Sequence, residues 1–416
     1  MKTKLQHWAI ITETQAASGD MITRLLEGPL PDGLTLLEDK TGVLFSSTEI
    51  ARYIEEEVRH DRKILTVNTS QSLESMSSGE RKKTLLRHLI ASKPDYLILD
   101  NPFDNLDTNS KKAFLEELNL LKSTVHILQI LSRKTDLLPF IDNVAFLQNN
   151  SLQWLNTSEI LDVATTLASK EFSASLPPPI HHYKYPHKKL IELRNVSVSF
   201  GTKPVLYNVN WCIHPGEFWE LKGKNGSGKT TILSMITGDN PKGYGQDLYL
   251  FGQKKGSGES VWDIKKQIGY VTPALTDRFR GYHTLQNMLI SGLVDSIGLY
   301  SIPTESQLNL ATKWLALLGM EHQKNTYFHE LNKGEQRLIM CARAMIKHPL
   351  LLILDEPTSD LDDQAAALVV ALVNKIAKES NNTIIFVSHR EEPQLQPQFV
   401  YELQAASIGS TGIILT

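Results

Sequence analysis

The pattern of apolar and polar positions changes its period along this chain. Residues 350–354 form a continuous aliphatic run, LLLIL, and residues 383–387 form another, TIIFV. Both runs are typical of parallel strands that are buried on both faces. Residues 334–346, just before the first run, are predicted to be a helix. Alternating helices and buried strands predict an α/β fold with a mostly parallel sheet.

A second feature is an internal repeat. Residues 76–107, MSSGERKKTLLRHLIASKPDYLILDNPFDNLD, align without a gap with residues 331–362, LNKGEQRLIMCARAMIKHPLLLILDEPTSDLD, at a constant offset of 255. Upstream, HWAIITETQAASGD, from residue 7, aligns with FWELKGKNGSGKTT, from residue 218, at an offset of 211. We therefore expect two homologous halves, residues 1–172 and 189–416, of which the first has a shorter middle.

The predicted linker between the halves is residues 173–188. It contains LPPPI followed by HHYKYPHKK, and its consecutive prolines lack the backbone N–H groups that a helix or a central strand needs. Its histidines, His181, His182 and His187, raise the alternative of a metal site. Because no carboxylate or cysteine accompanies them at ligand spacing, a solvated basic linker is the favoured interpretation.

The C-terminal half contains the pattern GKNGSGKT over residues 223–230, after an apolar stretch around Trp219. Its glycines permit backbone conformations in which N–H groups converge on phosphates, and the next helix adds its positive end. Lys229 is expected to reach the β- and γ-phosphates of ATP, and Thr230 to ligate Mg²⁺. An unrelated glycine-rich turn is the alternative, which the motifs downstream disfavour. The predicted ATP-binding residues are Gly223, Lys224, Asn225, Gly226, Ser227, Gly228, Lys229, Thr230 and Thr231.

Two carboxylates follow the aliphatic run. Asp355 ends the predicted strand, at the sheet edge beside the phosphate loop, and is expected to ligate Mg²⁺ together with Thr230. Glu356, on the opposite side of the strand end, is placed to orient or deprotonate the attacking water. His389, after residues 383–387, is expected to contact the γ-phosphate. We therefore predict Lys229, Glu356 and His389 as catalytic; a solvated turn with two carboxylates is the alternative.

Composition narrows the class of protein. With 41% apolar residues, 21% charged residues and a net charge of −3, bulk electrostatic binding to nucleic acid is disfavoured. The two cysteines, Cys212 and Cys341, predict a reducing cytoplasm. The N-terminal apolar stretch is too short for a signal peptide, and residues 365–373 are about half of what spans a bilayer. Direct membrane insertion is therefore not expected, and association with the inner face of a membrane would need a permease partner.

Five segments of the chain, in their order and spacing, resemble the phosphate loop, signature, Walker B strand, D-loop and switch histidine of the ATP-binding cassette (ABC) family. They are GKNGSGKT, LNKGEQ, LLLILDEP, SDLD and VSH. The resemblance covers nearly the whole chain and is strongest to the molybdate-transport (ModF-type) and photorepair-type tandem cassettes. It implies two tandem P-loop NTPase domains that use ATP and Mg²⁺, with Phe200 stacked on adenine. One departure is Thr272-Pro273, which stands where the family has a glutamine and weakens the case for ordinary coupling to a membrane partner.

The N-terminal half has a degenerate phosphate loop. Ser18 stands where Lys229 stands, so no cation would meet the phosphates. Side chains also replace three glycines, and they obstruct the left-handed turns that such a loop requires. Asn101 replaces the glutamate, and Arg133 is expected to replace the histidine. The residues in place of Gly223, Gly226 and Gly228 are Thr12, Gln15 and Ala17.

The signature of the N-terminal half survives, as MSSGE over residues 76–80. In ABC dimers each ATP lies between the phosphate loop of one half and the signature of the other. The resemblance therefore implies one composite site, in which Ser77 and Gly79 face the C-terminal phosphate loop. The N-terminal remnant would face Asn332 and Lys333, which depart from the signature.

Two other functions compete with an ATP-hydrolysing component of a transport system. A soluble ATP-switched module on the ribosome or on nucleic acid is one, although such tandem cassettes have long charged helical linkers. A nonhydrolytic regulator that signals ATP occupancy is the other, and the presence of Glu356 and His389 argues against it.

Overall fold

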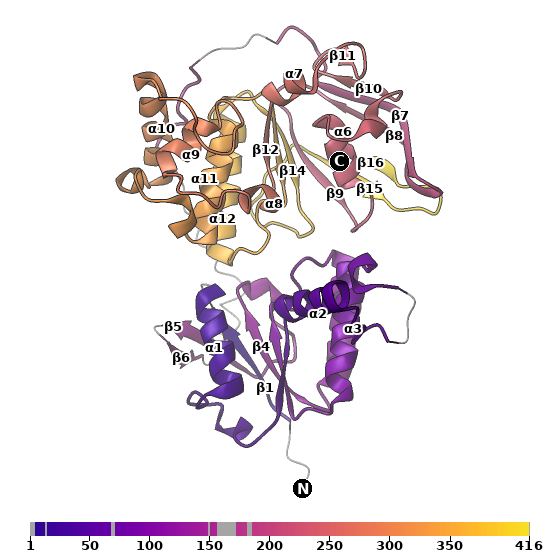
Figure 1. Cartoon of the computed structure of the whole chain (residues 1–416), viewed down its shortest axis with the longest axis vertical. Helices are drawn as coiled ribbons and strands as arrows, with labels where there is room; N and C mark the ends of the chain where they lie inside the picture. The colour runs from indigo at the N-terminus through magenta and orange to yellow at the C-terminus, as the bar shows by residue number, and fades with distance from the viewer. Residues whose placement is uncertain are drawn as a thin grey trace. The chain divides into compact units, whose positions relative to one another are not determined.

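The computed structural model describes residues 5–12, 15–67, 71–148, 150–155, 172–180 and 185–415. The chain divides into two compact units (Figure 1). The N-terminal unit is Met1–Leu167 with Leu361–Asp363, and the C-terminal unit is Ala168–Asp360 with Gln364–Thr416. Residues 172–180 form neither helix nor strand, as their prolines predict. His181 and His182 of the predicted linker lie outside the described residues.

The N-terminal unit is built around a six-stranded sheet in the order β2-β3-β4-β1-β5-β6, parallel except for β6. Its strands are β1 His7–Ile11, β2 Gly42–Phe45, β3 Tyr96–Asp100, β4 His126–Leu131, β5 Asn143–Gln148 and β6 Ser151–Trp154. Its helices are α1 Gln15–Glu27, α2 Ser47–His60, α3 Ser78–Ala91 and α4 Thr108–Leu121, with 3₁₀ turns at Thr35–Leu37, Leu73–Ser75 and Lys134–Asp136.

The two faces of this sheet are buried by different helices. Successive side chains of a strand point to opposite faces. In β3, Ile98 packs in a core with Met21 of α1, whereas Leu97 packs with Leu85 of α3 and Phe114 of α4. In Figure 1, α1 accordingly lies over one face of the sheet, and α2 and α3 lie over the other. Burial on both faces explains why the strands are apolar without alternation.

The C-terminal unit contains two sheets. The larger has the order β12-β13-β14-β9-β15-β16 and is parallel except for β16, and the smaller is antiparallel with the order β11-β10-β7-β8. The strands are β7 Ile191–Phe200, β8 Lys203–Ile213, β9 Phe218–Gly223, β10 Asp247–Leu250, β11 Gln253–Lys254, β12 Ile268–Val271, β13 Leu351–Asp355, β14 Thr383–Val387, β15 Phe399–Gln404 and β16 Thr411–Leu415.

The helices of this unit follow the strands of the larger sheet. They are α6 Lys229–Ile236, α7 Val261–Lys266, α8 Pro273–Thr276, α9 Leu285–Ser291, α10 Glu305–Leu318, α11 Lys333–Met345 and α12 Asp363–Glu379, with 3₁₀ turns at Pro241–Gly243, Glu321–Gln323 and Phe328–Glu330. The predicted helix 334–346 and the two predicted strands correspond to α11, β13 and β14. The predicted α/β fold with mostly parallel sheets is confirmed.

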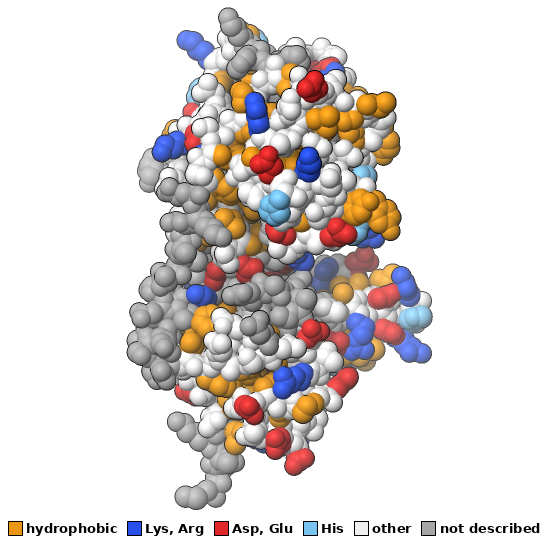
Figure 2. Space-filling view, turned by 90° about the vertical axis from the view of Figure 1, so that its left-hand side faces the viewer, with side chains coloured by type: hydrophobic (Ala, Val, Ile, Leu, Met, Phe, Trp, Pro, Cys, Tyr) orange, Lys and Arg blue, Asp and Glu red, His pale blue; other side chains and the backbone are white. Residues whose placement is uncertain are grey.

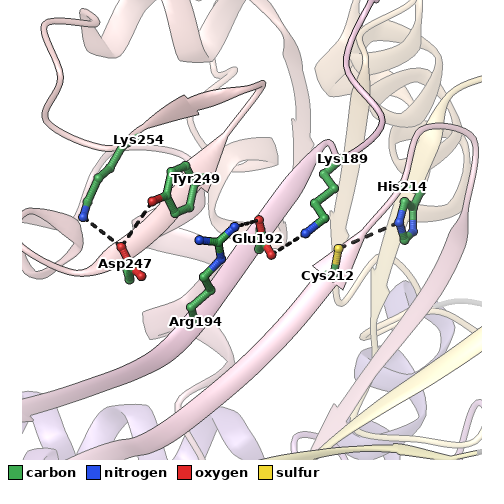
Figure 3. Close-up of polar contacts among 8 residues, drawn as sticks. All are labelled: Lys189, Glu192, Arg194, Cys212, His214, Asp247, Tyr249 and Lys254. Atoms are coloured by element: carbon green, nitrogen blue, oxygen red, sulfur yellow. Dashed lines mark hydrogen bonds and ion pairs between the residues drawn. The ribbon is translucent and has the colours of Figure 1, made fainter.

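The antiparallel sheet is amphipathic. Figure 3 shows the polar contacts on its outer face. The Glu192 carboxylate lies 2.6 Å from Lys189 Nζ and 2.8 Å from Arg194 Nη2. The Asp247 carboxylate pairs with Lys254 at 2.8 Å. The opposite face of β7 carries residues such as Leu193, Val196 and Val198, which belong to the core. The paired charges therefore lie on the half-exposed face of the sheet, where solvent weakens their attraction.

The internal repeat extends to unusual backbone conformations. Three pairs of residues at the offset of 255 adopt a left-handed conformation although none is glycine. They are Lys93 and His348 (φ 53° and 49°), Asn101 and Glu356 (42° and 53°), and Asn105 and Asp360 (58° and 57°). Such conformations are uncommon for side-chain-bearing residues. Their recurrence shows that the two units share the same turns before and after β3 and β13.

The surface charge and the length of the helices can be described for the residues that the structure covers. On the face shown in Figure 2, acidic and basic side chains are interspersed, and neither sign forms a continuous patch. Within the described ranges, none of the helices combines the length and the apolarity that crossing a bilayer requires.

Candidate active site

The phosphate-loop segment joins β9 to α6 in the C-terminal unit. Its three glycines, Gly223, Gly226 and Gly228, have φ of 151°, 78° and 98°. A Cβ atom would lie 2.9 Å from the Leu403 carbonyl oxygen at Gly223 and 2.6 Å from Leu206 Cδ2 at Gly228. The loop thus needs glycine for its left-handed turns and, at two positions, for close packing.

Lys229, the first residue of α6, lies beneath this loop. Its side chain is buried, and its Nζ donates to the carbonyl oxygens of Gly223 at 2.7 Å and Lys224 at 3.1 Å. Ser227 Oγ is also buried, and it has no hydrogen-bond partner among the described residues. Thr230, the predicted Mg²⁺ ligand, is exposed at the start of the helix. Three groups suited to a polyphosphate therefore lie at one loop. They are the Lys229 ammonium, the Ser227 hydroxyl and the N-terminus of α6.

Asp355 ends β13 at the same edge of the sheet. Its neighbour in the register is Val387 of β14, which pairs in turn with Leu221 of β9 two residues before the loop. Burial, reinforced by the nearby Glu356 carboxylate, raises the pKa of Asp355 to about 6. Tyr270 of β12 donates its hydroxyl to Asp355 Oδ2 at 3.4 Å, and Lys229 interacts favourably with the same carboxylate. A buried carboxylate of this kind fits a Mg²⁺ ligand, since a bound cation would favour its ionised form.

Glu356 and His389 lie together beside this carboxylate. Glu356 Oε1 is in direct contact with His389 Nε2, while His389 Nδ1 is buried without a hydrogen-bond partner among the described residues. The backbone N–H of Glu356 donates to the Val387 carbonyl oxygen at 2.9 Å. The structure therefore brings together the predicted base and the predicted histidine at the carboxyl ends of β13 and β14.

Phe200 ends β7, in the hairpin that packs against the phosphate loop. Leu206 of the next strand, β8, is the residue that a Cβ atom at Gly228 would meet. The Phe200 ring is 47% exposed, and Lys242 Nζ lies 5.8 Å from its centroid. An exposed ring on this hairpin is available for stacking with a base.

The last part of the equivalent segment in the N-terminal unit is helical. α1 begins at Gln15, which aligns with Gly226, whereas α6 begins only at Lys229. The helix is thus three residues longer at its N-terminal end than its counterpart. Gln and Ala are good helix formers and lack the freedom of glycine, so this segment continues the helix instead of forming a loop.

The register of the strands corrects one sequence assignment. Asp100 pairs with Ile130, as Asp355 pairs with Val387, so Ser132 occupies the place of His389 and Arg133 that of Arg390. The prediction that Arg133 replaces the histidine is therefore wrong by one residue. Ser132 makes the equivalent contact, because its backbone N–H and its Oγ reach Asn101 Oδ1 at 3.0 and 3.1 Å. The segment between β3 and β4 is two residues shorter than the segment between β13 and β14, and a sequence alignment places this gap ambiguously.

Both signature segments cap a helix in the same way. Ser77 accepts from the Glu80 N–H, and Glu80 in return accepts from the Ser77 N–H at 2.8 Å. Asn332 and Glu335 form the same capping box at the start of α11. Asn is as good a cap as Ser. The departure at Asn332 therefore leaves the helix intact, and it changes only the chemical group presented at its end.

Two residues near the site were not predicted from the sequence. They are Tyr270, which contacts Asp355, and Arg337 of α11, which donates to the Glu356 carbonyl oxygen at 3.0 Å. Neither belongs to a recognisable motif. Only the pairing of β12 with β13 and the packing of α11 reveal them.

Comparison with known proteins agrees with this geometry. A family model described as ABC transporter matches residues 206–359. The ABC transporter ATP-binding protein ModF of Escherichia coli is 38% identical over 339 residues, which cover 79% of this chain and 69% of that protein. An uncharacterized ABC transporter ATP-binding protein of Schizosaccharomyces pombe is 29% identical over 332 residues, covering 77% of this chain and 66% of its own length.

Among solved structures, a complex of the archaeal ribosomal stalk protein aP1 with the archaeal ribosome recycling factor aABCE1 contains a similar chain. It has a TM-score of 0.63 and 13% identity, and the match covers 98% of this chain and 85% of that one. A model of ribosome-bound archaeal Pelota and ABCE1 gives a TM-score of 0.65, also at 13% identity, over 99% and 74%. At this identity the likeness concerns the fold alone.

Proposed function

This chain belongs to the family of ABC transporter ATP-binding proteins, and we propose that it hydrolyses ATP to ADP and phosphate at one site per chain. The observation that carries the proposal is the contrast between the two loops. Gly223–Gly228 forms an open phosphate loop over Lys229, whereas Gln15–Ala17, which align with Gly226–Gly228, belong to α1. The first arrangement is suited to a nucleoside triphosphate, and the second lacks both the glycine turns and the lysine.

The proposed roles follow from the positions of the side chains. Lys229 and the N–H groups of the loop hold the phosphates, and Thr230 and Asp355 hold Mg²⁺, which withdraws charge from the phosphate oxygens when it is bound. Glu356 accepts a proton from the attacking water, or orients it. His389, in contact with Glu356, fixes the orientation of that carboxylate and faces the γ-phosphate.

We further propose that this site is composite, with Ser77 and Gly79 of the N-terminal signature completing it from the other half. The support is sequence and local structure. Ser77 is an exposed cap of the 14-residue helix α3, and its hydroxyl and the backbone N–H groups at the helix start are suited to a γ-phosphate. At the C-terminal signature, Asn332 and Lys333 offer an amide and a long side chain instead.

A partner for the ATPase is proposed from the names of its relatives. The relatives are named for ABC transporters, so we propose that this chain is a cytoplasmic protein that binds a membrane permease at the inner face of the membrane.

The proposed division of the chain is a degenerate cassette at 1–172, a linker at 173–188 and a complete cassette at 189–416. Pro273, where the family has glutamine, begins α8 and is half-buried.

The test of the partner uses Glu356→Gln, which should trap ATP without hydrolysing it. Affinity-tagged Glu356→Gln protein is recovered from cells with ATP, and Lys229→Ala protein, which should not bind ATP, is the matched control. A permease recovered with the first variant alone supports the transport role. Ribosomes recovered in the same ATP-dependent way would contradict it and favour the soluble ATP-switched module.

A further inference from the structure

The backbone of the proposed catalytic glutamate is connected to the signature helix of its own unit by a buried arginine. Arg337 lies in the second turn of α11, and only 6% of the residue is exposed. Its Nη1 donates to the carbonyl oxygen of Glu356 at 3.0 Å. Burial of a guanidinium costs solvation free energy, which its hydrogen bonds and the charges around it must offset.

The carbonyl that Arg337 contacts belongs to a residue with an unusual backbone. Glu356 has φ of 53°, which places its side chain beside His389 instead of along the line of β13. The same carbonyl oxygen also accepts from the Ser359 N–H at 3.2 Å and from Ser359 Oγ at 2.9 Å. A left-handed conformation in a residue that is not glycine persists only where its surroundings hold it. Arg337 is the one charged group among these donors.

Arg337 also lies among carboxylates that come from different segments. Asp277, at the end of α8, and Asp360, in the turn after β13, both interact favourably with its charge, as does Glu356. Burial nevertheless lowers the pKa of the guanidinium from its usual value. The arginine thus joins the signature helix, the segment after β12 and the turn that carries the base.

We propose that Arg337 is a positioning residue for hydrolysis, which holds the backbone of Glu356 in the conformation that directs its carboxylate at the attacking water. This inference rests on the proposed role of Glu356 as the base. In this role α11 acts within its own unit, through Arg337. This role is separate from any role of the signature segment that caps the N-terminus of the helix. Loss of the contact should lower turnover and leave ATP binding unchanged, because the loop and Lys229 are not touched.

The N-terminal unit supplies a natural comparison. Lys82 occupies the position of Arg337, and its Nζ donates to the Pro102 carbonyl oxygen at 2.8 Å, one residue beyond Asn101. Asn101 nevertheless keeps the left-handed conformation, with φ of 42°, so the turn forms in either case and the difference lies in which carbonyl the cation contacts. The direct contact to the peptide of the catalytic residue is specific to the unit that has the glutamate. Lysine carries a single ammonium, whereas the planar fork of arginine fixes direction as well as charge.

The experiment is a double-mutant cycle in the full-length chain, with Arg337→Met, Glu356→Gln and both together. Steady-state turnover and the Kd for ATP, from calorimetry, are measured for each. We expect Arg337→Met to lower kcat about tenfold or more, the scale of a charge-assisted hydrogen bond, with the Kd within about twofold of wild type. In the Glu356→Gln background the same change should lower kcat by less than about twofold, since there is no base left to position.

A matched control is Arg343→Lys, on the same helix. Arg343 is equally buried, but it contacts Ser291 Oγ and the Ser296 carbonyl oxygen, away from Glu356. It should cost thermal stability without changing kcat. If Arg337→Met does not fold, Arg337→Lys, which keeps the buried charge, decides the question. We expect it to fold, to bind ATP normally and to turn over at least about threefold more slowly than wild type.

Three results would overturn the proposal. One is an equal loss of kcat from Arg337→Met with and without Glu356, which would make its effect independent of the base. Another is a loss of ATP affinity as large as the loss of kcat, and the third is wild-type kcat in Arg337→Lys. Near-normal turnover by Glu356→Gln alone is a separate result, which would refute the base assignment and remove the ground for this inference as well.

Discussion

Ser18 and Asp100 are joined by a hydrogen bond of 3.3 Å in the N-terminal unit, from the serine hydroxyl to the carboxylate that aligns with Asp355. Asn101 donates to the same carboxylate oxygen at 3.0 Å. The residues that would hold phosphate and metal in an active cassette instead hold one another. Burial raises the pKa of Asp100, as it does that of Asp355, and the nearby cation that opposes this effect is Lys82 of α3, since the phosphate-loop lysine is replaced by Ser18. The degenerate half thus keeps the architecture of the site and has replaced its ligand-binding interactions with internal ones.

A single ATP should therefore bind per chain. We expect a stoichiometry close to one by calorimetry at saturating Mg-ATP. Ser18→Lys should not create a second site, because α1 already begins at Gln15 and the loop is missing along with the cation. A stoichiometry of two in the wild-type chain would show that the N-terminal unit binds nucleotide.

Loss of the phosphate-loop lysine and loss of the base should separate binding from hydrolysis. Lys229→Ala should abolish ATP binding, since its Nζ is the buried cation beneath the loop. Glu356→Gln should bind ATP and hydrolyse it at least about 100-fold more slowly, the scale of losing a general base. Binding is followed by calorimetry and hydrolysis by phosphate release. Near-normal turnover of the glutamine variant would refute the role of Glu356.

The two signature segments should differ in turnover and agree in stability. Ser77→Ala and Asn332→Ala each remove a helix cap, so both should lower stability by about 1 kcal/mol. Only Ser77→Ala should slow ATP hydrolysis, by about 10- to 150-fold for a lost charge-assisted hydrogen bond of about 1.5–3 kcal/mol. Asn332→Ala should change it less than about threefold. Thermal melts and steady-state turnover measure the two effects.

The glycines of these segments need different treatment. A Cβ atom at Gly334 would lie 2.6 Å from Ala365 Cβ, whereas one at Gly79 would lie 3.3 Å from Ser110 Oγ. Substitution of Gly334 therefore disturbs packing, and it is a poor probe of the site. Gly79→Asp, in contrast, should block a phosphate and slow turnover at least as much as Ser77→Ala. If the Asn332 variant were the impaired one and the Ser77 variant active, a homodimer that pairs C-terminal halves would replace the composite site.

The sequence predicts the site well where a motif fixes both residue and backbone. The three loop glycines adopt the expected left-handed turns, and Asp355 and Glu356 follow β13 as the aliphatic run predicts. It predicts poorly what depends on packing between distant segments. The hydroxyl of Tyr270 reaches Asp355 because β12 pairs with β13, and the position of Ser132 depends on a strand register that a two-residue gap obscures. Sequence spacing carries neither piece of information.

Activity should fall as the pH drops through about 6. Asp355, whose pKa is raised to about 6, must be ionised to ligate Mg²⁺. The folded state binds this proton more tightly than the unfolded chain, so protonation stabilises the free protein as the pH falls from 6 toward 4. Turnover and the stability of the C-terminal unit should thus move in opposite directions in that window. Tyr270→Phe removes a donor that lowers this pKa, and it should shift the acidic limb of kcat/KM to higher pH. A kcat/KM that is flat down to pH 5 would contradict the assignment.

The N-terminal unit should lose stability in mild acid, because two buried histidines at the start of β1 and β4 are held neutral. Lys40 Nζ can only donate, so at 3.0 Å from His126 Nε2 it fixes that nitrogen as an acceptor. His7 Nδ1 accepts from the Ile127 N–H at 3.2 Å. Burial lowers the pKa of both rings from 6.5, although Asp142 near His7 and Asp95 near His126 oppose the effect.

The sign of this effect follows from the protons bound. Below pH 6.5 the unfolded chain takes up protons that the folded unit does not, so the stabilisation is complete above pH 6.5 and is lost as the pH falls through the lowered pKa values. Hydrogen exchange of β1 and β4 in the full chain, corrected for intrinsic rates, should show a lower opening free energy at pH 5.5 than at pH 7.5. Lys40→Met removes the cation that faces His126 and should reduce the difference. Equal opening free energies at the two pH values would show that both rings are already free to take up a proton in the folded unit.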